Sequence, residues 1–153
     1  MKPAPEVLLV DDNPADVYLA SQALAEGPHP CRVSHARDGE EALAFLRHEG
    51  PYIGATQPDL VILDLSMPKK SGEAVLLAVR SDPKLSKIPV VIFSSSRSNR
   101  DIVRSYDLGA NCYLSKPASL QEFFATVQLI GEFFDCREPA PRGERWSNKP
   151  TYC

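Results

Sequence analysis

Short, continuous apolar runs, separated by segments with helical spacing, constrain the fold of this chain more than any other feature. Runs of this kind suit strands that are buried on both faces of a sheet. They lie at residues 7–10, 60–63, 90–93 and 112–114, with a weaker one at 31–36. The alternation of such runs with helical segments predicts βαβ units around a parallel sheet, so the expected fold class is α/β.

Residues that favour helix starts stand between the apolar runs. Pro14 suits the first helical position, and several helices begin after a side chain that can cap them. The predicted caps are Asn13, Asp38, Ser71, Asn99 and Ser119. We expect helices near residues 14–26, 38–48, 71–81, 99–108 and 119–134. With right-handed crossovers, five such strand–helix units favour the doubly wound strand order 2-1-3-4-5.

The length and charge of the chain limit the number of domains and the classes of partner that we expect. Its 153 residues suit one domain with a real core, which we place at residues 1–134, followed by a tail or docking arm at 135–153 without an output domain. Acidic residues exceed basic ones by 20 to 17, so no broad basic surface for nucleic acid is expected. No apolar run approaches the roughly 20 residues that span a bilayer, and we expect a cytoplasmic protein.

Acidic residues stand directly after two of the predicted strands. In an open parallel sheet, ligands bind beyond the carboxyl ends of the strands, where the strand order reverses. Asp11 and Asp12 follow the first strand and Asp64 follows the third, so the three carboxylates converge there. Like charges at this separation repel one another unless a cation neutralises them, and hard carboxylate oxygens suit Mg²⁺. The sequence therefore predicts a magnesium site.

Two further side chains point to phosphoryl transfer at the same edge of the sheet. Lys116 follows the fifth strand and brings an ammonium that pairs with a carboxylate or a phosphoryl oxygen. Ser94 adds a hydroxyl donor, although Ser95 and Ser96 leave open which hydroxyl acts. A nucleophilic carboxylate, a metal ion and these donors together fit the transfer of a phosphoryl group.

Four ordered motifs resemble the signature of CheY-like receiver domains, whose fold is the flavodoxin-like (βα)5 arrangement. The motifs are VLLVDD at residues 7–12, VILDLSMP at 61–68, VIFS at 91–94 and LSKP at 114–117. Separated motifs in the right order are far more specific than any single one. The resemblance covers roughly residues 6–134 and implies a response regulator of a two-component system.

The resemblance implies roles for the acidic residues. Asp64 is the phosphoacceptor, which becomes a 4-aspartylphosphate. Asp11, Asp12 and Asp64 are the side chains that hold Mg²⁺, and the backbone carbonyl of Ser66 completes the protein's share of the ligands. A domain of this kind is not a conventional enzyme, because it catalyses only its own phosphorylation and dephosphorylation.

The resemblance also implies roles for the residues around the phosphoryl group. Ser94 and Lys116 contact that group, and Ser94 replaces the more frequent threonine. Ser94 and Tyr113 form the switch, in which the aromatic side chain changes rotamer on activation. A cis peptide bond before Pro117 is implied as well.

Two segments further resemble the regulators that partner bacterial phytochromes, which are light-sensing histidine kinases. They are the long connection at residues 49–58 and the segment 104–117. The resemblance implies that a phytochrome supplies or removes the phosphoryl group.

The last predicted helix carries an apolar surface wider than one core-facing stripe. Core packing explains part of this surface, and the remainder predicts a homodimer. The expected dimer face combines this helix with the strand near 112–114 and the helix near 99–108. The apolar residues of the last helix are Leu120, Phe123, Phe124, Val127, Ile130, Phe133 and Phe134.

Three other classes of protein fit the sequence less well. A flavodoxin-type cofactor protein needs a phosphate-binding loop rich in Ser, Thr and Gly after the first strand, where this chain has Asp11 and Asp12. A haloacid-dehalogenase-type phosphatase places a second acid two residues after its nucleophile, where this chain has Ser66. A DNA-binding transcription factor needs an output domain after residue 134. We therefore expect the signal to pass through protein contacts.

Overall fold

The computed structural model describes residues 4–27 and 30–133 of the chain. Its strands are β1 (Glu6–Val10), β2 (Arg32–Ala36), β3 (Leu60–Leu63), β4 (Val90–Ser94) and β5 (Cys112–Ser115). Its helices are α1 (Pro14–Glu26), α2 (Gly39–Leu46), α3 (Gly72–Ser81), α4 (Asn99–Asp107) and α5 (Leu120–Phe133), with a short 3-10 helix at Gly50–Tyr52. Phe134 and the predicted tail at 135–153 lie outside the described residues.

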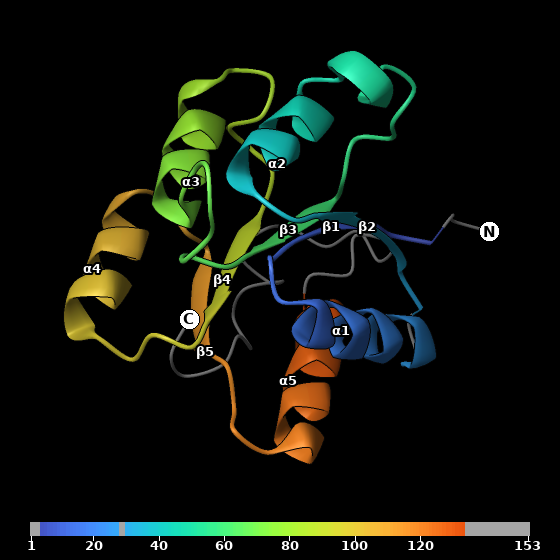
Figure 1. Cartoon of the computed structure of the whole chain (residues 1–153), viewed down its shortest axis with the longest axis vertical. Coiled ribbons are helices and arrows are strands. Elements are labelled where there is room, and N and C mark those ends of the chain that lie inside the picture. Colours follow the sequence, from blue (N-terminus) through green and yellow to red (C-terminus); the bar gives the residue numbers. More distant parts are fainter. Residues whose placement is uncertain (1–3, 28–29, 134–153) are drawn as a thin grey trace.

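The strands form one parallel sheet in the order β2-β1-β3-β4-β5, which confirms the predicted fold class and strand order. Helices α1 and α5 cover one face of the sheet, α2 and α3 cover the other, and α4 lies beside β5 (Figure 1). No helix in this part of the chain combines the length and the apolar character that crossing a bilayer requires.

Both faces of the sheet are buried, as the continuous apolar runs predict. Leu8 and Val10 of β1 point into a core shared with α2 and α3. Val7 and Leu9, one position along, point into a second core shared with α1 and α5. Successive side chains of a strand point to opposite faces, so a strand covered on both sides needs an apolar residue at every position.

Side chains cap the helices at most of the predicted positions. Asp38 Oδ1 accepts a hydrogen bond from the Glu41 N–H at 2.8 Å at the start of α2, and Ser71 caps α3. The predicted cap of α4 was wrong by one residue. Ser98, not Asn99, has the extended backbone of an N-cap, and its hydroxyl accepts from the Asp101 N–H. Asn99 already lies in the first turn of α4.

Candidate functional site

The sheet register brings the three predicted carboxylates together. Val10 of β1 pairs with Leu63 of β3, so Asp11 and Asp64 leave neighbouring strands at the same level. Asp11, Asp12 and Asp64 each offer an oxygen, and these oxygens lie within 4.8 Å of one another. Asp11 and Asp64 are buried, while Asp12 is exposed. Hard oxygen ligands at this spacing, open to solvent on one side, fit a divalent cation.

Hydrogen bonds hold the Asp11 carboxylate in one orientation. Oδ1 accepts from the Asn13 N–H at 2.9 Å, and Oδ2 faces Lys116 Nζ at 2.7 Å. Burial raises the pKa of the Asp11 carboxyl, and the hydrogen bonds from Lys116 and Asn13 only partly offset that effect. The main chain of Asp11 is held as well, because His35 Nε2 lies 2.9 Å from the Asp11 carbonyl oxygen. This contact links the end of β1 to β2.

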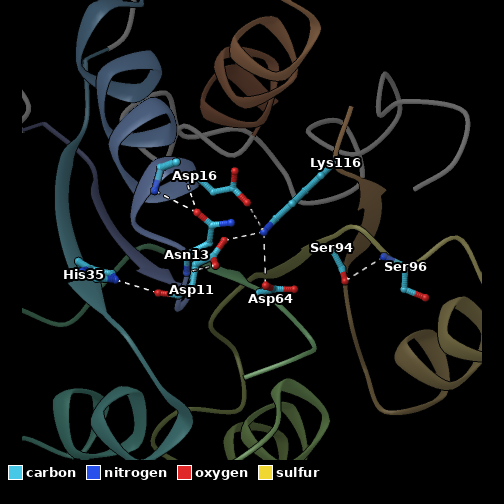
Figure 2. A network of polar contacts seen from close by, with 9 residues as sticks. Asp11, Asn13, Asp16, His35, Asp64, Ser94, Ser96 and Lys116 are labelled. Atoms are coloured by element: carbon cyan, nitrogen blue, oxygen red, sulfur yellow. Dashed lines mark hydrogen bonds and ion pairs between the residues drawn. The ribbon is translucent and has the colours of Figure 1, made fainter. Parts of the chain in front are cut away.

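Lys116 extends across the site to reach carboxylates from three segments (Figure 2). Its Nζ lies 2.7 Å from Asp11 Oδ2, 2.8 Å from Asp16 Oδ2 and 3.3 Å from Asp64 Oδ2. Burial lowers the pKa of the ammonium, but the hydrogen bonds to Asp11 and Asp16 and the nearby charges outweigh it and raise the pKa above its ordinary value. Lys116 is therefore held as a cation beside Asp64.

The structure distinguishes the three candidate hydroxyls after β4. Ser94 is 1% exposed and ends β4, and its carbonyl accepts from the Lys116 N–H at 2.8 Å. Ser95 is exposed. The Ser96 hydroxyl donates to Asp101 Oδ2 at 2.5 Å. The Ser94 hydroxyl accepts from the Ser96 N–H at 3.3 Å. Since Ser96 is engaged with α4 and Ser95 faces solvent, Ser94 is the buried serine at the end of β4.

Tyr113 ties β5 to the loop between β4 and α4. Its side chain is buried, and its hydroxyl donates to the Ser96 carbonyl at 2.8 Å. Its backbone N–H donates to the Tyr106 hydroxyl of α4 at 3.0 Å. Burial raises the pKa of both tyrosines, so both keep their protons and act as hydrogen-bonding groups. The loop that carries Ser96 is therefore coupled to α4 through Tyr113.

Glycine at position 72 lets α3 approach the backbone of the candidate phosphoacceptor. A Cβ atom at Gly72 would collide with the Asp64 carbonyl oxygen and lie 2.8 Å from Leu65 Cα. The Gly72 N–H in turn donates to the Leu65 carbonyl at 2.9 Å. The start of α3 therefore packs directly on the segment that positions Asp64.

Two expectations about the loops at the site have different outcomes. The expected cis peptide bond before Pro117 was wrong, because the described residues, Lys116 and Pro117 among them, contain no cis peptide bond. The trans chain already brings Lys116 Nζ to the carboxylates. Ser66 is exposed two residues after Asp64, and the role of its carbonyl stays a prediction.

The dimer face needs a correction at two residues. Phe123 and Ile130 are 4% and 1% exposed, since both pack into the core between α5 and the sheet. They are core residues and do not contribute to an exposed surface. The side chain of Phe133 and the whole of Phe134 lie outside what the structure describes.

Asp16 is the site residue that sequence reasoning missed. It lies in the first turn of α1, where an acidic residue is expected for helix stability alone. Its contact with Lys116 joins residues that are 100 positions apart. The sequence shows only that an acidic residue lies in the first turn of a helix close to Asp11 and Asp12. It does not show in which direction the side chain points.

Comparisons with known proteins agree with this arrangement. Residues 7–128 match the family model for the response regulator receiver domain. Response regulator Rcp1 of Synechocystis is 39% identical over 132 residues, which cover 86% of this chain and 90% of Rcp1.

Two solved structures share the fold and much of the sequence. The phosphorylated cyanobacterial phytochrome response regulator RcpA matches with a TM-score of 0.85 at 46% identity, over 91% of this chain and 99% of that chain. The Mn²⁺-bound form of Rcp1 matches with a TM-score of 0.83 at 37% identity, over 90% and 99%. The order of the strands, the acidic cluster and the family match together show that this chain belongs to the response regulator receiver domain family.

Proposed function

We propose that this chain receives a phosphoryl group on Asp64 and passes on the signal through protein contacts. The observation that carries the proposal is the environment of Asp64. Its carboxylate is buried beside the Asp11–Asp12 pair and lies 3.3 Å from the Lys116 ammonium. A carboxylate held next to a cation, at the carboxyl edge of a parallel sheet, is suited to attack an anionic phosphoryl donor.

The proposed reaction moves a phosphoryl group from a histidine of a sensor kinase to this chain. An Asp64 carboxylate oxygen attacks phosphorus and forms the new O–P bond. The P–N bond to the donor imidazole breaks, and its electron pair leaves with the ring nitrogen. Lys116 and the Ser94 hydroxyl bind phosphoryl oxygens and hold the group in place. Attack of water on the phosphorus of this acyl phosphate breaks the new O–P bond, releases inorganic phosphate and returns Asp64 to a carboxylate.

The acidic cluster fits a resident magnesium ion. Asp11, Asp12 and Asp64 would hold the ion with their carboxylates, and the backbone carbonyl of Ser66 would be the fourth contribution of the protein. The fit rests on three oxygens that lie within 4.8 Å of one another. When bound, the ion neutralises charge on the phosphoryl oxygens. The existence of an Mn²⁺-bound form of the relative Rcp1 supports a divalent ion as the ligand.

Ser94 and Tyr113 are the proposed switch. Ser94 is drawn toward the phosphoryl group when Asp64 is modified, and the β4–α4 loop moves with it. Tyr113 responds because its hydroxyl donates to the Ser96 carbonyl in that loop at 2.8 Å. The phosphoryl group then biases two arrangements of α4 and β5 that already exist.

The proposed partner is a phytochrome sensor kinase, and the proposed location is the cytoplasm, where ATP charges such kinases. The similarity to RcpA, a cyanobacterial phytochrome response regulator, supports this partner.

We further propose a homodimer through α4, β5 and α5. Val103 and Leu120 are 58% and 69% exposed on α4 and α5. A groove of about 380 Å³ is lined by residues of the same three elements, among them Ile102, Leu114 and Glu122. Residues 135–153 are proposed as a docking arm.

Incubation with acetyl phosphate and Mg²⁺, followed by intact mass, tests the proposed acceptor. The wild type should gain one hydroxylamine-labile phosphoryl group, and Asp64→Asn or a chelator should prevent it. Asp59→Asn is the matched control, because Asp59 lies at the opposite end of β3 and its carboxylate accepts from the Glu6 N–H. An adduct that persists in Asp64→Asn, or no adduct on the folded wild type, would refute the proposal.

A further inference from the structure

Three carboxylates share the Lys116 ammonium, and one of them has no role in the proposed chemistry. Asp11 is a proposed metal ligand and Asp64 is the proposed acceptor. Asp16, on α1, is neither, yet its Oδ2 lies 2.8 Å from Nζ, as close as Asp11 at 2.7 Å. The contact joins the start of α1 to the residue that follows β5.

Helix stability alone does not explain this contact. An acidic residue in the first turn of a helix favours the positive end of the helix dipole, and Asn13 Oδ1 caps the Asp16 N–H at 3.3 Å. These interactions account for the type of residue at position 16. They do not account for the direction of the side chain, whose carboxylate points across the site to Lys116 (Figure 2).

The resting site uses the full hydrogen-bonding capacity of the ammonium. A lysine ammonium has three N–H donors, and the three carboxylates match that number. The Lys116 side chain is only 9% exposed, so water has little access to it. A phosphoryl oxygen therefore binds Nζ only by displacing one of the carboxylates.

We propose that Asp16 is a positioning residue that competes with the phosphoryl group for Lys116, and that it thereby weakens and shortens the phosphorylated state. The inference rests on the proposed function, because it takes Asp64 as the acceptor. Asp16 is suited to this role since metal binding engages Asp11 and phosphorylation modifies Asp64. Of the three partners, only Asp16 keeps an unmodified, metal-free carboxylate throughout the cycle.

Binding of beryllofluoride, a phosphoryl analogue, in the presence of Mg²⁺ tests this role by calorimetry. Asp16→Ala removes both the charge and the acceptor atom, whereas Asp16→Asn removes the charge and keeps an acceptor oxygen. Glu40→Gln is the matched control, because Glu40 is an exposed acid in the first turn of α2. The Kd should fall by about three- to tenfold in Asp16→Ala, the range that corresponds to the typical net contribution of one intramolecular hydrogen bond. The fall should be smaller in Asp16→Asn and absent in Glu40→Gln.

A second readout is the half-life of the adduct formed with acetyl phosphate. This half-life should lengthen most in Asp16→Ala, less in Asp16→Asn and not at all in Glu40→Gln. If Asp16 acted only by long-range repulsion between its charge and the bound anion, the pattern would differ. Both Asp16 variants would then change the Kd equally, and the change would disappear at high salt. That pattern would overturn the proposal, as would an unchanged or higher Kd in either folded variant. If the wild type binds no beryllofluoride, the proposed function fails and this inference fails with it.

Discussion

Replacing Gly72 by alanine tests how the fold positions Asp64. The new Cβ would collide with the Asp64 carbonyl oxygen, and it would lie 2.8 Å from Leu65 Cα and 3.0 Å from the Asp64 carbonyl carbon. All of these are backbone atoms, which cannot rotate aside as a flexible side chain does. Either the start of α3 or the backbone of Asp64 must therefore move.

The size of the effect follows from this clash. Overpacking a close-packed region costs about 1–3 kcal/mol, and replacing glycine by alanine in a helix recovers at most about 1 kcal/mol. Because the new Cβ meets backbone atoms, we expect a cost at the upper end of that range, about 2–3 kcal/mol, so Gly72→Ala should lower the free energy of unfolding by about 1–2 kcal/mol in total. The rate of phosphorylation should fall by at least about tenfold, because a displacement near 1 Å at a reacting group costs up to about 100-fold.

Gly131→Ala is the matched control, since Gly131 also lies in a helix that packs on a neighbour. Its new Cβ would meet only side-chain atoms, Leu24 Cδ2 at 3.3 Å and Cys31 Sγ at 3.9 Å. This variant should keep the wild-type stability or exceed it. Urea unfolding gives the stabilities, and intact mass after acetyl phosphate treatment gives the rates. A Gly72→Ala variant with the stability and the phosphorylation rate of the wild type would refute the argument.

Three further predictions address a cap, a half-buried cation and the metal. Ser98→Ala should cost about 1 kcal/mol in urea unfolding because α4 loses its cap, whereas Asn99→Ala should cost less than about 0.5 kcal/mol. Arg80→Met should cost about 2 kcal/mol or more by the same assay, because the guanidinium donates to the Ser86, Ile88 and Gly109 carbonyls and to Asn111 Oδ1. Arg80→Lys should not restore that loss, since an ammonium lacks the planar fork. Mg²⁺ at about 100 times its Kd should stabilise the wild type by about 2.7 kcal/mol, seen as a higher Tm, and should leave Asp12→Asn nearly unchanged.

Much of the fold was predictable because local sequence and tertiary burial agree. The apolar runs that become β1, β3 and β4 are short and bounded by polar residues, and a sheet covered on both faces requires that pattern. The cap of α1 was predictable since Asn13 acts on N–H groups two and three residues away. The cap of α4 was misplaced because Ser98 and Asn99 are both good caps, and the path of the loop decides between them.

The candidate site was predictable in its members and less so in its contacts. Asp11, Asp12 and Asp64 follow strands that a parallel sheet must bring to one edge, so their convergence follows from topology. Phe123 and Ile130 were assigned to a dimer face, yet both are buried. Sequence periodicity shows that α5 is broadly apolar, but it does not show how much of that surface α1 and the sheet cover.

The amino-acid sequence determines the order of the elements, the class of the sheet and the residues that reach its carboxyl edge, since these depend on patterns within about ten residues and on the parallel connection rule. Tertiary structure alone decides that Asp16 meets Lys116, that Tyr113 holds the Ser96 carbonyl and that α3 packs on the Asp64 backbone. These contacts depend on the path of loops and the direction of side chains from distant segments. Local sequence carries no signal for either, because packing of the whole domain sets both.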